Sequence, residues 1–455
     1  MLTSEKINEK IFREYDIRGV ADVDLPDTLV YQLGKAIATF MEHKGTRRIT
    51  VGRDCRLSSD RIFKALTRGL LECGVDVCDI GLVPTPLLYF SVVHLKMEGG
   101  IMITGSHNPG EHNGFKICVG PSTIHGEEIQ EVKNILLAAK FAAGKGATTR
   151  ASVIKDYIAY VTENIRRPLK LKIVVDSGNG MGGIVGPELY RALGCEVTEL
   201  YSELDGRFPN HHPDPTVLEH MKALVAKVKE TGAIVGIGFD GDADRIGVID
   251  RTGKVIYGDE LLVLYARQVL KTHPGSTIIS EVKASHRLFK DIADHGGVPI
   301  LWKTGHSLIK SKMKESGALL AGEMSGHMFF KDRYFGYDDA IYAGARLLEI
   351  LDETKKSPAE LLADLPPSFS TPELRMDCPD DRKFDVVESA KKDFERQGLK
   401  VNGIDGARVE FGDGWGLVRA SNTQPVLVYR FEASSEKRLQ EIRKTVETTV
   451  ARFLK

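Results

Sequence analysis

Short runs rich in valine and isoleucine alternate with helix-like stretches along most of this chain. The runs fall at residues 48–52, 100–104, 172–176, 233–237 and 277–280. Strands of this kind, apolar without a regular polar alternation, belong in sheets that helices cover on both faces. Their repeated alternation with helices predicts several α/β units.

The length allows more than one such unit. At roughly 100–200 residues per domain, the 455 residues suffice for three or four domains. Helices are expected at 60–73 and 187–193, each after one of the strands. The first three segments share a strand–loop–helix layout, which suggests that the units are related.

The final part of the chain departs from this alternation. Pro366 and Pro367 indicate a linker. Beyond it we expect a charged helix at 382–397, a strand at 425–431 and a last helix at 436–453. This composition predicts a smaller α+β domain.

Positive and negative charges are balanced. Lysine and arginine total 62, aspartate and glutamate total 63, and the formal net charge is -1. Because both signs are interspersed, the chain lacks the electrostatic character of a protein that binds nucleic acid or an anionic membrane surface. We expect no nucleic acid and no membrane as partners, so any anionic ligand must be bound by a local site.

The six cysteines are scattered and form no C-x-x-C pair, which argues against a disulfide framework and structural zinc. Reduced thiols are typical of a cytosolic protein. The first residues carry charge where a signal peptide needs an apolar stretch. The most apolar early region is broken by Pro84, Pro86 and His94, and it is too short and too interrupted to span a bilayer. We therefore predict a soluble cytoplasmic protein.

The first candidate site, residues 104–109, directly follows an apolar strand. Gly105 permits unusual backbone angles beside Ser106, and Pro109 fixes the exit of the loop. With His107 next to it, a serine presented in this way suits a nucleophile or a carrier of a phosphoryl group. An ordinary polar turn would look the same, so this pair of residues alone does not decide between the two.

Three carboxylates at alternate positions, Asp240, Asp242 and Asp244, follow another strand. Neighbouring carboxylates repel one another unless a cation or solvent relieves them. The loop is not an EF-hand, because Arg245 and Arg251 stand where glycine and glutamate are required. Alternate spacing in an extended loop can direct three carboxylates to one Mg²⁺. A solvated acidic loop is the alternative, but the apolar strand on each side favours a metal site.

A third loop, residues 322–327, places three functional groups two positions apart between glycines. They are Glu323, Ser325 and His327. Such a loop can aim all three side chains at one ligand. On this spacing alone, a ligand site and an ordinary loop are equally good interpretations.

A fourth loop contains Arg419, Ser421, Asn422 and Thr423. One guanidinium, two hydroxyls, an amide and the N–H groups of the loop suit a dianionic phosphate. A hydrogen-bonded turn is the alternative.

Residues 178–183 fit the pattern G-x-G-x-x-G between a strand and a helix, and Glu199 lies about twenty residues on, as in dinucleotide-binding proteins. Such patterns are frequent in a chain with 45 glycines. An NAD-dependent oxidoreductase that uses this segment is therefore kept as a minor alternative. Residues 236–241 fit the pattern too, but they lead into carboxylates that would repel a pyrophosphate.

Taken together, these loops resemble the α-D-phosphohexomutase superfamily, and most closely its bacterial phosphomannomutase/phosphoglucomutase group. Residues 12–19 look like the N-terminal signature, 104–109 like the phosphoserine loop and 240–245 like the metal loop. Residues 322–327 look like the sugar-specificity loop and 419–425 like the phosphate-binding loop. The resemblance covers essentially the whole chain, with the motifs in the order of the family.

The resemblance implies three related α/β domains around a central cleft, plus a C-terminal α+β domain similar to the TATA-box-binding protein. We expect the α/β domains at 1–151, 152–253 and 254–366, and the C-terminal domain at 367–455. In that order they would contribute the phosphoserine, metal, sugar and phosphate loops.

The resemblance also implies roles for single residues. Ser106 would carry the phosphoryl group and, with Asp240, Asp242 and Asp244, would bind Mg²⁺. The residues expected around the transferring group are His107, Lys116, Arg18, Arg245 and His327. Those expected to contact the sugar are Tyr15, Lys283, Gly305, His306, Glu323 and Ser325. Those expected to hold the non-reacting phosphate are Arg419, Ser421, Asn422 and Thr423.

The implied reaction interconverts hexose 1-phosphate and hexose 6-phosphate, with mannose or glucose or both as the sugar, through a phosphoserine enzyme and a 1,6-bisphosphate intermediate. Glucose 1,6-bisphosphate or a similar compound would act as activator. The partners would be hexose phosphates, and the protein a monomer or small homo-oligomer.

Two alternatives use the same loops. A phosphoglucosamine mutase would need the same machinery, but relatives of that type usually have glutamine where this chain has Met324. A catalytically silent sugar-phosphate binding protein would have no use for Ser106 and all three aspartates.

Overall fold

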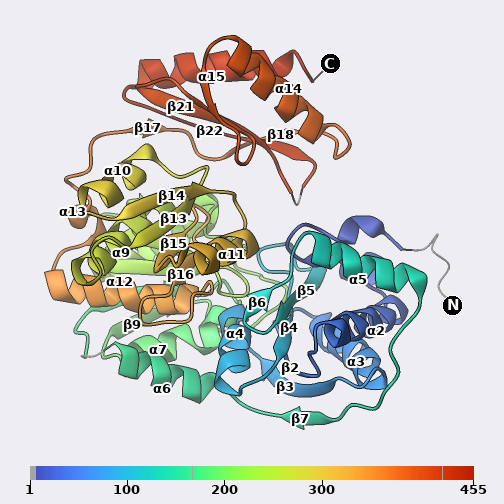
Figure 1. Cartoon of the computed structure of the whole chain (residues 1–455). Helices are drawn as coiled ribbons and strands as arrows, with labels where there is room; N and C mark the ends of the chain where they lie inside the picture. The colour runs from blue at the N-terminus through green and yellow to red at the C-terminus, as the bar shows by residue number, and fades with distance from the viewer. Residues whose placement is uncertain (1–6, 166–167, 423, 455) are drawn as a thin grey trace.

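The computed structural model places four β-sheets one after another along the chain, each with its own helices (Figure 1). It describes residues 7–165, 168–422 and 424–454. Among these residues, no helix is both long and apolar enough to cross a membrane.

The first sheet combines parallel and antiparallel strands. β2 (Arg48–Arg53) pairs in parallel with β3 (Asp76–Leu82) and β4 (Gly99–Ile103), while β5 (His112–Val119) pairs antiparallel with β4 and with β1 (Ile17–Val20). The remaining elements of this unit are η2 (Glu9–Ile11), α1 (Ala21–Asp24), α2 (Asp27–His43), α3 (Ser59–Glu72), α4 (Thr85–His94), β6 (Ser122–Thr123), α5 (Glu127–Ala138) and β7 (Thr148–Arg150).

Helices cover both faces of this sheet, as the apolar strands predict. On β4, Ile101 and Ile103 belong to the apolar core that includes α2, α3 and α5. Met102 belongs to a different core, which contains Leu87 and Leu88 of α4. Because both faces of β4 are buried, polar residues have no favourable position on it.

The second sheet has β8 (Lys172–Asp176) between its parallel neighbours β9 (Glu196–Leu200) and β10 (Val235–Phe239). β11 (Ile246–Asp250) runs antiparallel to β10, and β12 (Val255–Ile256) pairs with β11. The other elements are α6 (Ile154–Asn164), η3 (Met181–Ile184), α7 (Gly186–Ala192), η4 (Leu218–Met221) and α8 (Lys222–Thr231). The domain boundary expected after residue 253 precedes β12, so the second sheet extends three residues beyond it; the boundaries stay a prediction.

The third sheet has β13 (Thr277–Glu281) between its parallel neighbours β14 (Val298–Trp302) and β15 (Leu320–Gly322), and β16 (Met328–Phe330) is antiparallel to β15. The helices are α9 (Gly258–Thr272), α10 (His286–Asp294), α11 (His306–Ser316), α12 (Ala340–Thr354) and α13 (Pro358–Leu361).

The three α/β units share one strand arrangement, which confirms the expected relation between them. In each, a central strand has two parallel neighbours, and one of these neighbours turns back into an antiparallel strand: β4 into β5, β10 into β11, and β15 into β16. The connecting loops contain Ser106, the three aspartates and Glu323 respectively. Three of the four candidate loops therefore occupy equivalent places in three equivalent folds.

The fourth unit is α+β, as the sequence predicts. Its sheet is antiparallel throughout, in the order β17-β22-β21-β20-β19, with β18 also on β22. The elements are β17 (Phe369–Ser370), β18 (Leu374–Asp377), α14 (Lys383–Arg396), β19 (Lys400–Asn402), β20 (Ala407–Glu410), β21 (Gly414–Ala420), β22 (Val426–Ala433) and α15 (Glu436–Ala451). Both helices pack on one face of this sheet (Figure 1).

The fourth unit is attached differently from the other three. One large apolar core runs continuously through α4 of the first unit, α6 and α7 of the second, and α9 and α12 of the third. The C-terminal unit has a separate core, and its contact with the third is a small cluster in which Trp415 and Leu417 meet Val282. The first three units thus share one core, and the fourth unit is joined to the third by a much smaller apolar cluster.

Close helix packing in the first unit generates a prediction about stability. A Cβ atom on Gly69 of α3 would lie 2.2 Å from the Tyr31 carbonyl oxygen of α2. We expect Gly69→Ala to lower the free energy of unfolding by about 1–3 kcal/mol, although alanine is the better helix former. Lys64→Ala, on the exposed side of the same helix, is the control and should stay within about 0.5 kcal/mol. Equal urea midpoints for the two variants would contradict the close contact.

Candidate functional site

A cavity of about 700 Å³ is lined by residues of all four units. It brings together every described residue that the sequence analysis assigned to the transferring group or to the sugar phosphate: Tyr15, Arg18, Ser106, His107, Lys116, Arg245, Lys283, Gly305, His306, Glu323, Ser325, His327, Arg419, Ser421 and Asn422. Thr423 lies outside the described residues. The three aspartates do not line the cavity but are fully buried behind it.

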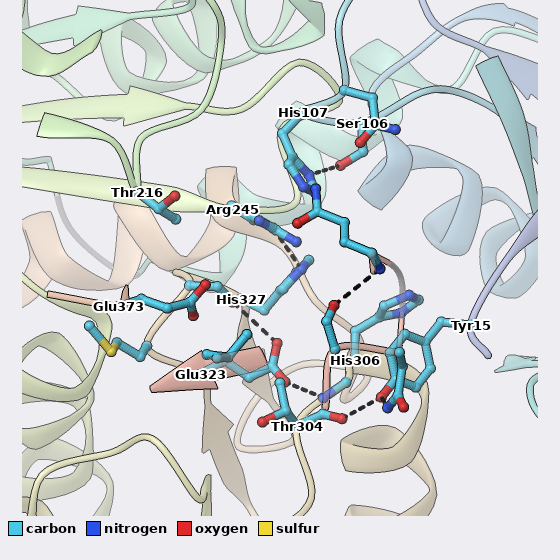
Figure 2. Close-up of a pocket in the computed structure, with 18 of the residues that line it drawn as sticks. Tyr15, Ser106, His107, Thr216, Arg245, Thr304, His306, Glu323, His327 and Glu373 are labelled. Atoms are coloured by element: carbon cyan, nitrogen blue, oxygen red, sulfur yellow. Dashed lines mark hydrogen bonds between the residues drawn. The ribbon is translucent and has the colours of Figure 1, made fainter. Parts of the chain in front are cut away.

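Ser106 adopts a backbone conformation that is unusual for serine. Its φ is +49°, in the left-handed region, and such conformations persist where surrounding structure enforces them, often at functional sites. The Ser106 hydroxyl donates to Asp240 Oδ2 at 3.0 Å and lies 3.1 Å from His107 Nδ1 (Figure 2). One small loop thus places a hydroxyl between an imidazole and a buried carboxylate.

The aspartate loop is a tight connection between β10 and β11. Ala243 has a φ of +57°, and Asp240 Oδ1 accepts hydrogen bonds from the backbone N–H groups of Asp244 and Arg245, both at 3.1 Å. The loop therefore gathers its carboxylates on one point: oxygens of Asp240, Asp242 and Asp244 lie within 4.8 Å of one another.

Positive groups compensate part of this buried negative charge. Lys116 Nζ, on β5, lies 2.8 Å from Asp242 Oδ2 and also pairs with Asp244. Thr85 lies in the first turn of α4, and its hydroxyl donates to Asp242 Oδ2 at a distance of 2.5 Å. The helix dipole also favours an anion at this end of α4. Burial alone would lower the pKa of Lys116, but the two carboxylates outweigh it and raise that pKa.

The donor set fits a hard divalent cation. Among the described residues, Asp242 Oδ1 and Asp244 Oδ1 are buried and have no hydrogen-bond partner. Burial, together with the charges of its two neighbours, raises the pKa of Asp240 well above its ordinary value. Unpaired carboxylate oxygens in a buried cluster are what Mg²⁺ prefers as ligands, so the residues present fit that ion.

The glycine-rich segment at 178–183 supports this loop instead of binding a dinucleotide. A Cβ on Gly180 would lie 2.7 Å from the Gly241 carbonyl oxygen, and one on Gly241 would lie 2.5 Å from the carbonyl oxygen of Ser106. Gly183 is similarly close to Ser202, and Glu199 pairs with Arg191 at 2.5 Å. Close packing, of Gly180 against the aspartate loop and of Gly183 against Ser202, accounts for these two glycines.

His327 is oriented from two sides. Arg245 Nε donates to His327 Nε2 at 3.0 Å (Figure 2), so the ring proton must be on Nδ1. Nδ1 lies 3.1 Å from the Asp244 carbonyl oxygen and 3.2 Å from Asp338 Oδ2. Asp338 is itself paired with Lys310 at 2.9 Å. The imidazole therefore has a fixed position between the aspartate loop and the third sheet.

The side of the cavity opposite Ser106 is polar. Glu323 Oε1 accepts from the Gly305 N–H at 2.6 Å, and Ser325 donates to Glu323 at 3.3 Å. Tyr15 donates to the Thr304 carbonyl oxygen at 2.7 Å, which joins the first unit to the third (Figure 2). Carboxylate, hydroxyl and N–H groups in one wall can recognise sugar hydroxyls by hydrogen bonds.

The C-terminal unit closes this polar end. Arg419 lies on β21 and not in the loop after it, and its Nε donates to Asp405 Oδ2 at 3.1 Å. Asp405 Oδ2 also accepts from the Thr304 N–H at 2.9 Å, and Asn422 donates to the Tyr15 hydroxyl at 2.6 Å. A buried, paired guanidinium and the adjoining amide are therefore oriented toward the cavity by contacts with two other units.

Comparison with known proteins decides the family. Models of the phosphoglucomutase/phosphomannomutase family match the chain in four consecutive parts: α/β/α domain I at residues 9–143, domain II at 155–253, domain III at 257–369 and the C-terminal domain at 373–449. The chain belongs to the phosphoglucomutase/phosphomannomutase family.

Individual relatives agree with this assignment. A phosphomannomutase/phosphoglucomutase of Pseudomonas putida is 47% identical over 99% of this chain and 97% of its own length. A phosphoglucomutase of Neisseria gonorrhoeae is 46% identical over 98% of this chain and 97% of its own. The crystal structure of a phosphoglucomutase/phosphomannomutase family protein from Burkholderia thailandensis superposes with a TM-score of 0.92, at 42% identity, and covers 98% of this chain and 97% of its own.

Several residues of the site in this family member escaped the sequence analysis. Thr85, Asp338 and Asp405 act on predicted residues from distant parts of the chain, and nothing in their local sequence marks them. Glu281 is fully buried and accepts from the backbone N–H groups of Lys283 and Met324. Thr85 and Asp405 make contacts across units, whereas Asp338 and Glu281 contact other loops of the third unit, and only the folded chain reveals these contacts.

The aspartate cluster predicts how cation binding responds to mutation. Asp242→Asn should weaken Mg²⁺ binding, measured by titration calorimetry, by about tenfold or more, because an amide oxygen replaces an anionic ligand. Asp60→Asn is the control, since its exposed carboxylate pairs with Arg53 far from the cluster. Unchanged Mg²⁺ affinity in the Asp242 variant would show that the cation is not bound there.

Proposed function

We propose that the chain is a phosphohexomutase that interconverts hexose 1-phosphate and hexose 6-phosphate, with mannose or glucose or both as the sugar. The observation that supports this most directly is the distribution of groups in one cavity. The Ser106 hydroxyl lies against the buried aspartate cluster at one end, and Arg419 with Asn422 lies at the other. A mutase needs both a phosphoryl carrier and a distant phosphate anchor.

The proposed reaction has two phosphoryl transfers. In the first, the free hydroxyl oxygen of the bound sugar monophosphate bonds to the phosphorus of phosphoserine 106, the P–Oγ bond breaks, and the hydroxyl proton leaves to a basic group. The product is a 1,6-bisphosphate. After this intermediate turns end for end, Oγ takes the other phosphoryl group, the sugar oxygen regains a proton, and Ser106 is phosphorylated again.

Catalysis of such transfers depends on positioning and on stabilising charge. Mg²⁺ bound by Asp240, Asp242, Asp244 and an oxygen on Ser106 would supply positive charge next to the transferring phosphoryl oxygens. Lys116, Arg18 and Arg245 line the same end of the cavity and add positive charge of their own. His107 and His327 are the imidazoles there that can hold or release the proton. Burial and the nearby positive charge of Arg245 lower the pKa of His107 well below its ordinary value.

The remaining residues would bind and orient the substrate. We assign the sugar hydroxyls to Tyr15, Lys283, Gly305, His306, Glu323 and Ser325, and the non-reacting phosphate to Arg419, Ser421, Asn422 and Thr423. A 1,6-bisphosphate such as glucose 1,6-bisphosphate would prime the enzyme by phosphorylating Ser106. The six free cysteine thiols favour a reducing compartment, so a cytoplasmic location stays our prediction.

The sugar is the least constrained part of this proposal. Met324 lies in the cavity wall beside Glu323, and its side chain offers no oxygen or amide to an amino sugar. A coupled assay that compares glucose 1-phosphate, mannose 1-phosphate and glucosamine 1-phosphate under one set of conditions ranks the candidates. Preferred turnover of glucosamine 1-phosphate would contradict the proposed specificity.

Replacing the serine tests the carrier role. Ser106→Ala should nearly abolish turnover while leaving the fold intact, because a loop hydroxyl contributes little to packing. Intact-mass measurement after incubation with glucose 1,6-bisphosphate should show one added phosphate on the wild type and none on the variant. Undiminished turnover by Ser106→Ala would refute the assignment.

Replacing the arginine tests the distant anchor. A charge-assisted contact to phosphate is worth about 1.5–3 kcal/mol, so Arg419→Ala should lose roughly tenfold to hundredfold in kcat/KM. Because remote binding energy also orients the reacting end, kcat is expected to fall with affinity. Ser106 should still be phosphorylated by added bisphosphate, since its loop is untouched.

The matched control for Arg419 is Arg396→Ala, an exposed arginine on the helical side of the same unit. It should have wild-type kinetics. If Arg419→Ala also has wild-type kinetics for the monophosphate, the C-terminal unit does not hold the substrate as proposed.

A further inference from the structure

One buried guanidinium donates hydrogen bonds to four backbone carbonyl oxygens within residues 106–112, the segment that contains Ser106. Arg56 follows β2, and its side chain has no exposed surface. Nη2 donates to the carbonyl oxygens of Ser106 and Asn108, at 2.8 and 2.6 Å. Nη1 donates to the carbonyl oxygens of Pro109 and of His112, the latter at 3.0 Å.

The fifth donor of Arg56 is also used. Nε donates to Asp54 Oδ2 at 3.1 Å, and the same carboxylate accepts from the Gly105 N–H at 3.2 Å. An arginine side chain has five N–H donors in a rigid plane, and here each has an acceptor. Gly105 is needed for this packing, because a Cβ on it would lie 2.5 Å from the Arg56 guanidinium carbon. Arg56 and Asp54 together hold the loop from Gly105 to His112.

The second unit holds the same loop from another direction. His212 Nε2 lies 2.5 Å from the His107 carbonyl oxygen. This carbonyl lies between those of Ser106 and Asn108, which both accept from Arg56. The Phe208 ring packs 5.2 Å from the Arg56 guanidinium. Gly206 approaches the backbone so closely that a Cβ there would lie 2.6 Å from Arg56 Cα. Side chains of the first unit (Arg56) and of the second unit (His212) therefore both hold the loop that contains Ser106.

We propose that Arg56 is the positioning residue of the phosphoryl carrier: together with His212 it fixes the backbone of residues 105–112 and so sets the place of Ser106 Oγ. Because the peptide group is planar and trans, holding the carbonyls of Ser106, His107 and Asn108 fixes the backbone after the serine. The peptide before it is held by the Ser106 N–H, which donates to Thr104 Oγ1 at 2.8 Å. This holds Ser106 at its φ of +49° and its hydroxyl at 3.0 Å from Asp240. Arg56 itself does not line the cavity.

The inference rests on the proposed mutase function for its kinetic part and on geometry alone for its backbone part. If the loop is held by Arg56, losing the guanidinium should misplace the reacting oxygen without changing the distant substrate contacts. A misplacement of about 1 Å can cost about a hundredfold in rate. A residue that only stabilised the fold would instead lower the melting temperature and leave kcat per folded molecule unchanged.

The test compares Arg56→Lys with Arg61→Lys in the full chain. Lysine keeps the charge but has at most three donors on one atom, so at least one buried carbonyl of the loop loses its partner. Arg61, on α3, also donates to two backbone carbonyls, those of Ala21 and Leu25, but neither belongs to residues 105–112. It is therefore matched in residue type, unit and kind of contact.

We expect Arg56→Lys to lose about tenfold to hundredfold in kcat for glucose 1-phosphate, with KM changed by about twofold at most. Phosphorylation of Ser106 by glucose 1,6-bisphosphate, followed by intact mass, should slow by a similar factor. Hydrogen exchange in peptides that cover residues 104–114 should accelerate in this variant and not in Arg61→Lys, whose kcat should match the wild type.

A second pair of variants covers the case in which Arg56→Lys does not fold. His212→Phe keeps an aromatic ring but removes the donor to the His107 carbonyl, whereas His212→Gln keeps a donor. His212→Phe should lower kcat and speed exchange in the same peptides, and His212→Gln should restore both in large part.

The proposal is overturned if folded Arg56→Lys and His212→Phe keep wild-type kcat and wild-type exchange at residues 104–114. Absence of mutase turnover in the wild type would instead contradict the proposed function, and the exchange comparison would still decide the positioning role. The two failures are therefore distinguishable.

Discussion

Three carboxylates buried within 4.8 Å of one another are the constraint on which the site depends. Such a cluster is stable only if positive charge and hydrogen-bond donors meet it, because burial penalises every unpaired charge. Lys116 and Thr85 of the first unit supply part of that compensation. The first and second units must therefore pack against each other at this point, and the Ser106 hydroxyl is held on the same cluster.

The architecture then distributes the remaining tasks among equivalent loops. In each of the three related sheets, one loop connects a parallel strand to its antiparallel neighbour. These loops provide Ser106, the three aspartates, and Glu323 with Ser325 and His327, respectively. The fourth unit has a different fold and contributes Arg419 and Asn422 through contacts with Thr304 and Tyr15. Besides a small apolar cluster at Trp415, hydrogen bonds such as those of Asp405 and Asn422 join this unit to the units that provide the rest of the site.

Much of this could be predicted from the sequence, for identifiable reasons. The strands at 48–52 and 172–176 are apolar because both faces of their sheets are buried, and the aspartate loop is conspicuous because three carboxylates stand at alternate positions. Arg56 was not predicted, because an arginine after a strand gives no local indication that its guanidinium is buried under another loop. The segment at 178–183 shows the opposite difficulty and was kept as a minor alternative, since glycines needed for close packing have the same spacing as glycines that bind a pyrophosphate.

The most direct test of the account follows the phosphoryl group itself. Enzyme phosphorylated with a ³²P-labelled bisphosphate and freed of excess ligand is mixed with glucose 1-phosphate, and the label is followed through a single turnover. The account predicts that the label leaves the protein, passes through the bisphosphate and is recovered in glucose 6-phosphate. Label that stays on the protein, or that is released as inorganic phosphate without labelling the sugar, would contradict it.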